Sequence, residues 1–131
     1  MKLLLSLCIF ISLSGCFSDE LPNYSREQLL NMGREGDPNL EVLVPASISE
    51  SLVNCHEYTP SCRFGYRVII KKIEMVALFY EKQDDALKAA KRVRGYVARN
   101  WVFDDVAGEP ILERFVQKYF KAVKAESVTK K

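Results

Sequence analysis

The sequence has few of the residues and motifs that most enzymes and membrane-spanning proteins need. It contains a single histidine, His56, so any histidine-based triad or metal site would have to use that residue. It contains no P-loop, no Gly-x-Gly-x-x-Gly fingerprint and no His-Glu-x-x-His motif. Its long apolar run, Leu3–Leu13, has 11 residues, whereas a helix needs about 20 to cross a bilayer. We therefore expect no enzyme, no cofactor, no bound metal and no membrane span.

The short apolar run has the layout of a secretory signal. Lys2 precedes it, and the small residues Ser14 and Gly15 follow it. The stretch Leu13-Ser14-Gly15-Cys16 resembles the lipobox of bacterial lipoproteins, in which the cysteine thiol is diacylated and the bond before the cysteine is then cut. The resemblance implies that residues 1–15 are a signal peptide and that Cys16 carries a lipid that anchors the chain to a membrane of the bacterial cell envelope.

The residue after the lipid cysteine bears on the choice of membrane. In Gram-negative lipoproteins an aspartate there commonly retains the product in the inner membrane, and this chain has Phe17 instead. The resemblance therefore implies the outer membrane, with the protein facing the periplasm. We expect residues 16–24 to be a lipidated tether, residues 25–125 to be a single folded domain, and residues 126–131 to be a frayed tail.

Two cysteines remain once Cys8 leaves with the signal peptide and Cys16 carries lipid. Cys55 and Cys62 would then face an oxidising compartment, where such a pair is expected to form a disulfide. A redox role usually has Cys-x-x-Cys spacing, which this pair lacks. A metal site that adds His56 would lack a fourth ligand. The sequence therefore predicts a structural disulfide.

Hydrophobic periodicity predicts the order helix, strands, helix, strand, helix. Ser25 and Gln28 fit a capping box that starts a helix over 26–34. Residues 66–80 predict either two strands with a tight turn or one long strand with a bulge. Further helices are expected over 84–100, with Gly95 inside it, and over 110–124, and strands over 40–44, 48–55 and 101–103. We expect an α+β fold of two layers, with helices on one face of a mostly antiparallel sheet.

Charge is distributed unevenly although the net charge is only +2. Residues 19–57 contain eight acids and two bases, whereas residues 58–131 contain nine acids and sixteen bases. Lys88, Lys91, Arg92 and Arg99 would lie on the outer face of the helix over 84–100 and form a candidate binding face. Nucleic acid is not an expected partner in the envelope, so we expect an envelope protein or the cell wall, and anionic lipid headgroups are a further option for the basic face.

Asp104, Asp105 and Glu109 form the one compact acidic cluster of the sequence. Such carboxylates could serve a small envelope hydrolase or a metal-binding lipoprotein. Adjacent aspartates between a strand and a proline-started helix more often form a turn or cap the helix. The sequence therefore favours a lipid-anchored, non-enzymatic binding or scaffolding module. The alternatives are a function of the acidic cluster and a peptidoglycan-associated module that uses the basic helix.

Overall fold

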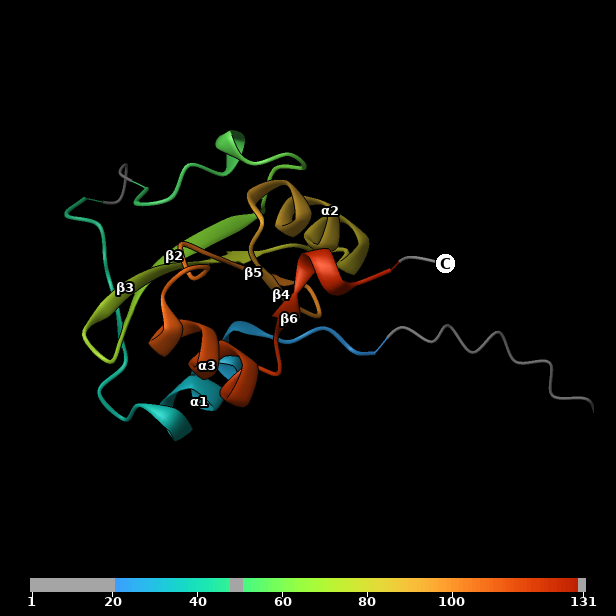
Figure 1. Ribbon diagram of the computed structural model, residues 1–131. Helices are drawn as coiled ribbons and strands as arrows, with labels where there is room; N and C mark the ends of the chain where they lie inside the picture. The colour runs from blue at the N-terminus through green and yellow to red at the C-terminus, as the bar shows by residue number, and fades with distance from the viewer. Residues whose placement is uncertain (1–20, 48–50, 130–131) are drawn as a thin grey trace, which may run out of the picture.

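A six-stranded antiparallel sheet forms the centre of the protein, with strand order β1-β2-β3-β5-β4-β6 (Figure 1). The computed structural model describes residues 21–47 and 51–129, so the predicted signal peptide, lipobox and Cys16 lie outside the described residues. The α+β class is confirmed. The elements are α1 (Arg26–Gly36), β1 (Glu41–Val42), the 3-10 turn η1 (Cys55–Glu57), β2 (Phe64–Ile70), β3 (Ile73–Phe79), α2 (Gln83–Val93), β4 (Tyr96–Ala98), β5 (Trp101–Asp104), α3 (Pro110–Tyr119), β6 (Val123–Lys124) and the 3-10 turn η2 (Ala125–Ser127).

Helices cover both faces of the sheet, so the prediction of two layers with helices on one face is wrong. Met75 and Ala77 of β3 belong to the core cluster that contains residues of α1 and α3. Val76 and Leu78 of the same strand belong to the cluster that contains the alanines of α2. The physical reason is that the central strands are apolar at consecutive positions, so both faces must be shielded from water.

The hairpin of β2 and β3 decides between the two alternatives for residues 66–80. Ile70 pairs with Ile73, which leaves Lys71 and Lys72 as a two-residue turn. Both lysines have positive φ, 51° and 68°, as the primed turns of tight hairpins require because their twist matches that of the strands. Two strands with a tight turn are therefore correct, and the bulge is not.

Helix α2 is shorter than predicted, because it ends at Val93 and not near residue 100. Arg94 adopts a left-handed conformation at φ 54°, and the Gly95 N–H donates to the Ala90 carbonyl at 2.9 Å. A Cβ on Gly95 would lie 2.7 Å from the Phe103 carbonyl oxygen. Gly95 is thus a close-packed residue after the helix, and Tyr96 and Val97, which lie within the predicted helix 84–100, belong to β4.

The C-terminal region also differs from the prediction. Helix α3 begins at Pro110 as expected but ends at Tyr119, after which Lys121 turns the chain at φ 58°. Residues 123–124 then form the edge strand β6 beside β4. The turn η2 follows, and its first residue, Ala125, is fully buried. The predicted start of the frayed tail at residue 126 is therefore too early, because Ala125 and Val128 pack on the α2 side of the sheet.

The segment before β2 contains no strand among its described residues 51–55, in contrast to the prediction of a strand over 48–55. Residues 48–50 lie outside the described part. Cys55 instead begins η1, and Cys55 and Cys62 lie at disulfide distance, with their Cα atoms 4.8 Å apart. The predicted strand over 40–44 is present only as Glu41–Val42. The loop around the cysteines packs Val53 and Cys62 against the α2-side cluster, which explains why it needs no strand pairing.

Candidate functional site

The candidate binding face on α2 contains fewer free cations than predicted. Lys88, Lys91 and Arg92 are exposed on this helix. Lys88 forms an ion pair with Asp84 at 3.1 Å, one helical turn earlier, and such exposed pairs contribute about 0.3–0.5 kcal/mol. Lys91 and Arg92 form no salt bridge with any residue of the described ranges. They are the two cations that this face can offer to a partner.

Arg99 is not on the α2 face, because it lies in the turn between β4 and β5, at φ 55°. Its Nη1 atom donates to the Pro22 carbonyl at 2.6 Å. Its guanidinium also lies over the Tyr24 ring, 4.7 Å from the ring centroid, which is a cation–π arrangement. Arg99 therefore binds the N-terminal segment of its own chain.

The segment Leu21–Tyr24 is bound to the domain through a site that the sequence did not predict. The fully buried Asn100 accepts a hydrogen bond from the Tyr24 N–H at 2.8 Å and donates to the Tyr80 carbonyl at 3.1 Å. The Trp101 indole donates to the Tyr24 carbonyl at 2.9 Å. The one available sequence signal was an asparagine beside an apolar strand, where a buried amide needs partners.

Gln83, at the start of α2, holds the same segment from its other side. Its side-chain amide donates to the Leu21 carbonyl and to Asn23 Oδ1, the latter at 2.9 Å. The Asn23 amide in turn donates to the Glu81 carbonyl at 3.0 Å. Residues 21–24 of the predicted tether 16–24 are thus attached to the sheet and to α2, and residues 16–20 lie outside the described part.

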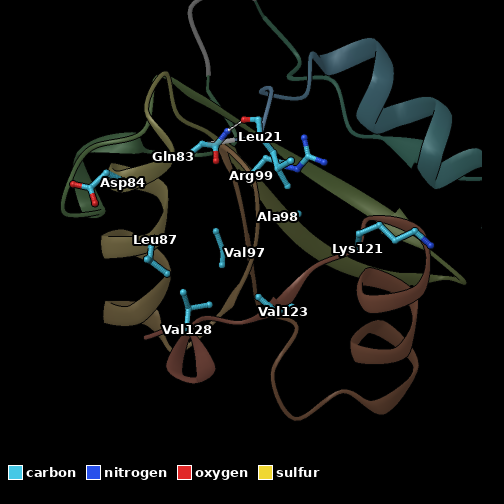
Figure 2. Close-up of a pocket in the computed structure, with 10 residues that line it drawn as sticks. All are labelled: Leu21, Gln83, Asp84, Leu87, Val97, Ala98, Arg99, Lys121, Val123 and Val128. Carbon is cyan, nitrogen blue, oxygen red and sulfur yellow. Dashed lines mark hydrogen bonds between the residues drawn. The ribbon is translucent and has the colours of Figure 1, made fainter. Parts of the chain in front are cut away.

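A groove of about 430 Å³ lies directly beside this attached segment, between α2, β4 and β6 (Figure 2). Figure 2 shows Leu21 and Arg99 at one end and Val128 at the other, with Val97 between them. Leu21 and Val123 are 57% and 46% exposed, although both are large apolar residues. The lining residues are Leu21, Gln83, Asp84, Leu87, Val97, Ala98, Arg99, Lys121, Val123 and Val128. We call this the tether groove.

A second groove, of about 380 Å³, lies between α1 and strands β1 and β2. Leu30, Val42 and Tyr66 contribute its apolar surface, and Arg26 and Arg34 contribute its positive charge. Arg26 forms an exposed ion pair with Glu27 at 3.1 Å, whereas Arg34 has no salt bridge within the described ranges. This groove could accept an apolar group that carries a negative charge.

The acidic cluster is only partly brought together. Asp104 and Asp105 line a polar cavity of about 350 Å³ with Tyr58 and Arg67, whereas Glu109 does not line it. Asp104 accepts hydrogen bonds from the Tyr58 hydroxyl at 2.8 Å and from the Asp105 N–H at 2.9 Å. Both bonds hold the turn after β5, and Glu109 takes the N-cap position of α3 without a side-chain cap. The two aspartates therefore build a turn and do not cap the helix.

The environment of this cavity raises two pKa values. Burial raises the pKa of the Tyr58 hydroxyl, and its hydrogen bond to Asp104 raises it further. Burial likewise raises the pKa of Asp105, with the neighbouring Asp104 charge adding to the shift and Arg67 opposing it. Both pKa values are raised because the folded protein favours the protonated side chains. Ionisation of Asp105 therefore lowers the stability of the folded state.

We expect Asp105→Asn to raise the melting temperature at neutral pH. A raised carboxyl pKa means that the folded protein binds the proton more tightly than the unfolded chain, so the ionised form destabilises the fold once the pH exceeds the unfolded value of about 3.9. The gain should therefore disappear as the pH falls below that value. Asparagine tolerates the left-handed backbone of this position, φ 61°, as well as aspartate does. Thermal unfolding across the pH range measures the effect.

Glu27→Gln is the matched control for Asp105→Asn. The pKa of Glu27 is lowered by its own backbone N–H and then by Arg26, so loss of this charge should bring no gain. An Asp105→Asn protein that is less stable than the wild type at neutral pH would contradict the prediction. If the acidic cluster instead performs hydrolysis or holds a metal, this variant should lose function in the cell while it remains stable.

The remaining candidates are a metal site, the single histidine and a membrane-spanning helix. Within residues 21–47 and 51–129, no group of three histidine, cysteine, aspartate or glutamate side chains is placed to hold a metal ion. His56 is exposed in η1, and its N–H donates to Asn54 Oδ1 at 3.0 Å, which is a local turn contact. None of the helices in the described part is both long and apolar enough to cross a bilayer.

Comparisons with protein-family models, with curated proteins and with solved structures find no match for this chain. The function is therefore inferred from the chain's own residues and their geometry. The features that bear on it are the attached segment Leu21–Tyr24, the two apolar grooves and the free cations on α2.

Proposed function

We propose that this protein is a lipid-anchored component of the bacterial cell envelope whose folded domain binds or scaffolds another envelope component without catalysis. The observation that carries the proposal is Leu13-Ser14-Gly15-Cys16, which ends a short apolar run and resembles a lipobox. Two acyl chains on Cys16 would anchor the chain stably, because each buried CH₂ contributes about 0.8 kcal/mol. The anchoring membrane is the outer membrane, with the domain in the periplasm, since Phe17 stands where an inner-membrane retention signal has aspartate.

The geometry of the N-terminal segment supports an anchored domain. Arg99, Asn100 and Gln83 hold residues 21–24 by hydrogen bonds, and only four residues separate Cys16 from the first described residue, Leu21. Fully extended, the five Cα–Cα steps from Cys16 to Leu21 span at most about 18 Å. The domain would thus be held close to the membrane surface, as suits a protein that acts on neighbours within the envelope.

The polar residues support binding more than catalysis. Asp104 uses both carboxylate oxygens as acceptors for Tyr58 and for the Asp105 backbone. Lys91 and Arg92, by contrast, are exposed cations without a salt bridge in the described ranges, and Arg34 adds another beside the α1 groove. An acidic envelope protein or the carboxylates of peptidoglycan would complement these charges.

Cys16→Ser is expected to abolish lipid attachment and to leave an uncut precursor, because serine has no thiol to accept the diacylglyceryl group. Metabolic labelling of cells with a palmitate analogue, followed by intact-mass measurement, tests both effects. Cys8→Ser is the matched control, since it removes a cysteine from the apolar run and leaves the lipobox intact. Equal label in the wild type and in Cys16→Ser would overturn the proposed anchor.

A further inference from the structure

We propose that the tether groove lies against the membrane that anchors the protein and binds a phospholipid, with the acyl chain in the groove and the phosphate at its cations. This inference rests on the lipid anchor proposed above and adds the orientation of the domain and a ligand. Three features carry it: the place where the tether meets the domain, the rigidity of that attachment, and the chemistry of the groove.

The first feature is the position of Leu21. This residue lines the tether groove (Figure 2), and it is also the first described residue, which connects the domain to the sequence that contains Cys16. The five Cα–Cα steps from Cys16 to Leu21 span at most about 18 Å. The headgroup layer on each side of a bilayer is about 5–8 Å thick. Because the lipid on Cys16 sits in the bilayer, the entrance of the groove stays within a short distance of the headgroups.

The second feature is that the attachment fixes residues 21–24 beside the groove. Tyr24 is bound through its backbone to the buried Asn100 and to Trp101. Pro22 is bound to Arg99 at 2.6 Å, and Leu21 is bound to the side chain of Gln83. The hydrogen bonds reach both ends of the segment, so any motion of the tether relative to the groove must occur before residue 21.

The third feature is the chemistry of the groove, which matches a phospholipid. Its floor includes the buried Val97 and Ala98, and its rim carries two exposed apolar residues, Leu21 and Val123. Exposed apolar side chains of this size are favoured in contact with the acyl region just below the headgroups. An acyl chain or the glycerol region of a lipid could therefore cover surface that water now covers.

The charges on the groove suit a phosphate group. Arg99 and Lys121 both line it. Arg99 gives one N–H to the Pro22 carbonyl, and a guanidinium has five N–H donors. The one carboxylate in the lining, Asp84, is paired with Lys88 at 3.1 Å. The groove therefore has net positive character, which anionic headgroups attract.

The test uses the full-length, lipidated protein reconstituted into vesicles of phosphatidylcholine and phosphatidylglycerol. Val123→Cys introduces the one free thiol, because Cys8 leaves with the signal peptide, Cys16 is lipidated and Cys55 is bridged to Cys62. A bimane label at this thiol reports contact with lipids that carry a spin label near the headgroup. Val44→Cys is the control, since Val44 follows β1 at the opposite edge of the sheet and is 83% exposed. We expect the label at position 123 to lose most of its emission and the label at position 44 to lose little.

A charge variant tests the phosphate contact. Lys121→Glu in the Val123→Cys protein should reduce the quenching at position 123 in these anionic vesicles. Lys72→Glu is the matched control, because Lys72 has a similar left-handed backbone, φ 68° against 58°, and lies in the β2–β3 turn away from the groove. Lys72→Glu should leave the quenching unchanged. Equal effects of the two variants would overturn the phosphate contact.

The outcomes separate the two proposals. If the protein floats with the vesicles but positions 123 and 44 are quenched alike, the lipid anchor holds and the proposed orientation is wrong. The groove would then be open to a protein partner. If the protein does not float with the vesicles and its mass shows no lipid, the anchor is wrong and this inference fails with it.

Discussion

Replacing Asn100 with leucine is expected to lower the free energy of unfolding by about 2–4 kcal/mol and to release residues 21–24 from the domain. Asn100 is fully buried and is bonded to the Tyr24 N–H, the Tyr24 carbonyl and the Tyr80 carbonyl. Leucine has a similar size but no polar side-chain atoms, so the Tyr24 N–H and the Tyr80 carbonyl would lose the Asn100 side chain as a partner, while the Tyr24 carbonyl would keep the Trp101 indole. Urea unfolding gives the stability, and amide hydrogen exchange at Tyr24 reports the release.

Asn23→Ala is the control for Asn100→Leu, because Asn23 lies in the same segment but is exposed and its contacts are to exposed groups. We expect it to cost less than about 1 kcal/mol. An Asn100→Leu protein as stable as the wild type, with Tyr24 still protected from exchange, would contradict the role of Asn100. Release of the segment would also lengthen the free tether, so this variant should weaken the contrast between positions 123 and 44.

Loss of the Cys55–Cys62 bridge is expected to cost about 2–3 kcal/mol while the fold persists. A loop this short removes roughly that much entropy from the unfolded chain on the loop-closure model. The bridge fixes the loop that packs Val53 against the α2-side cluster and places the Pro60 carbonyl to accept from the Tyr80 hydroxyl at 2.6 Å. The sheet and both helical layers are built from other residues, so unfolding should stay cooperative.

The measurement compares Cys55→Ala/Cys62→Ala with the wild type in urea, with and without a reducing agent. Reduction should lower the stability of the wild type and leave the double variant unchanged. Alkylation of the native protein, read by mass, gives an independent check. Two alkylated thiols without prior reduction would refute the bridge, and equal stability of oxidised and reduced wild type would refute its stabilising role.

Features that depend on neighbouring residues were predicted well. Ser25 and Gln28 form the capping box that starts α1, with bonds of 3.2 and 2.8 Å between side chains and backbone. Pro110 begins α3, and the strand pattern of residues 66–80 appears as β2 and β3. The disulfide pair also followed from composition and spacing. Each of these features is decided within a few residues of chain, so periodicity and capping rules were sufficient.

The candidate binding residues were predicted less well, because their neighbours come from distant parts of the chain. Lys88, Lys91 and Arg92 lie on one helix as expected, but Arg99 belongs to the turn that holds the N-terminal segment. Asp104 and Asp105 share a cavity with Tyr58, whereas Glu109 stands apart from it. Sequence spacing placed these residues near one another, and the turns between the elements decided which of them meet.

What the sequence determined by itself is the class of each local segment: a capped helix, β structure over residues 66–80, a proline-started helix, a bridged loop and a lipobox-like N-terminus. What the tertiary structure alone decided is where α2 ends, which faces of the sheet the helices cover and where the tether attaches. Arg94 ends α2 in a left-handed conformation, and residue 95 after it is a glycine because a Cβ there would lie 2.7 Å from the Phe103 carbonyl oxygen. Tyr24 is held by Asn100 across 76 positions of sequence. Such contacts depend on the path of the whole chain, so no local pattern encodes them.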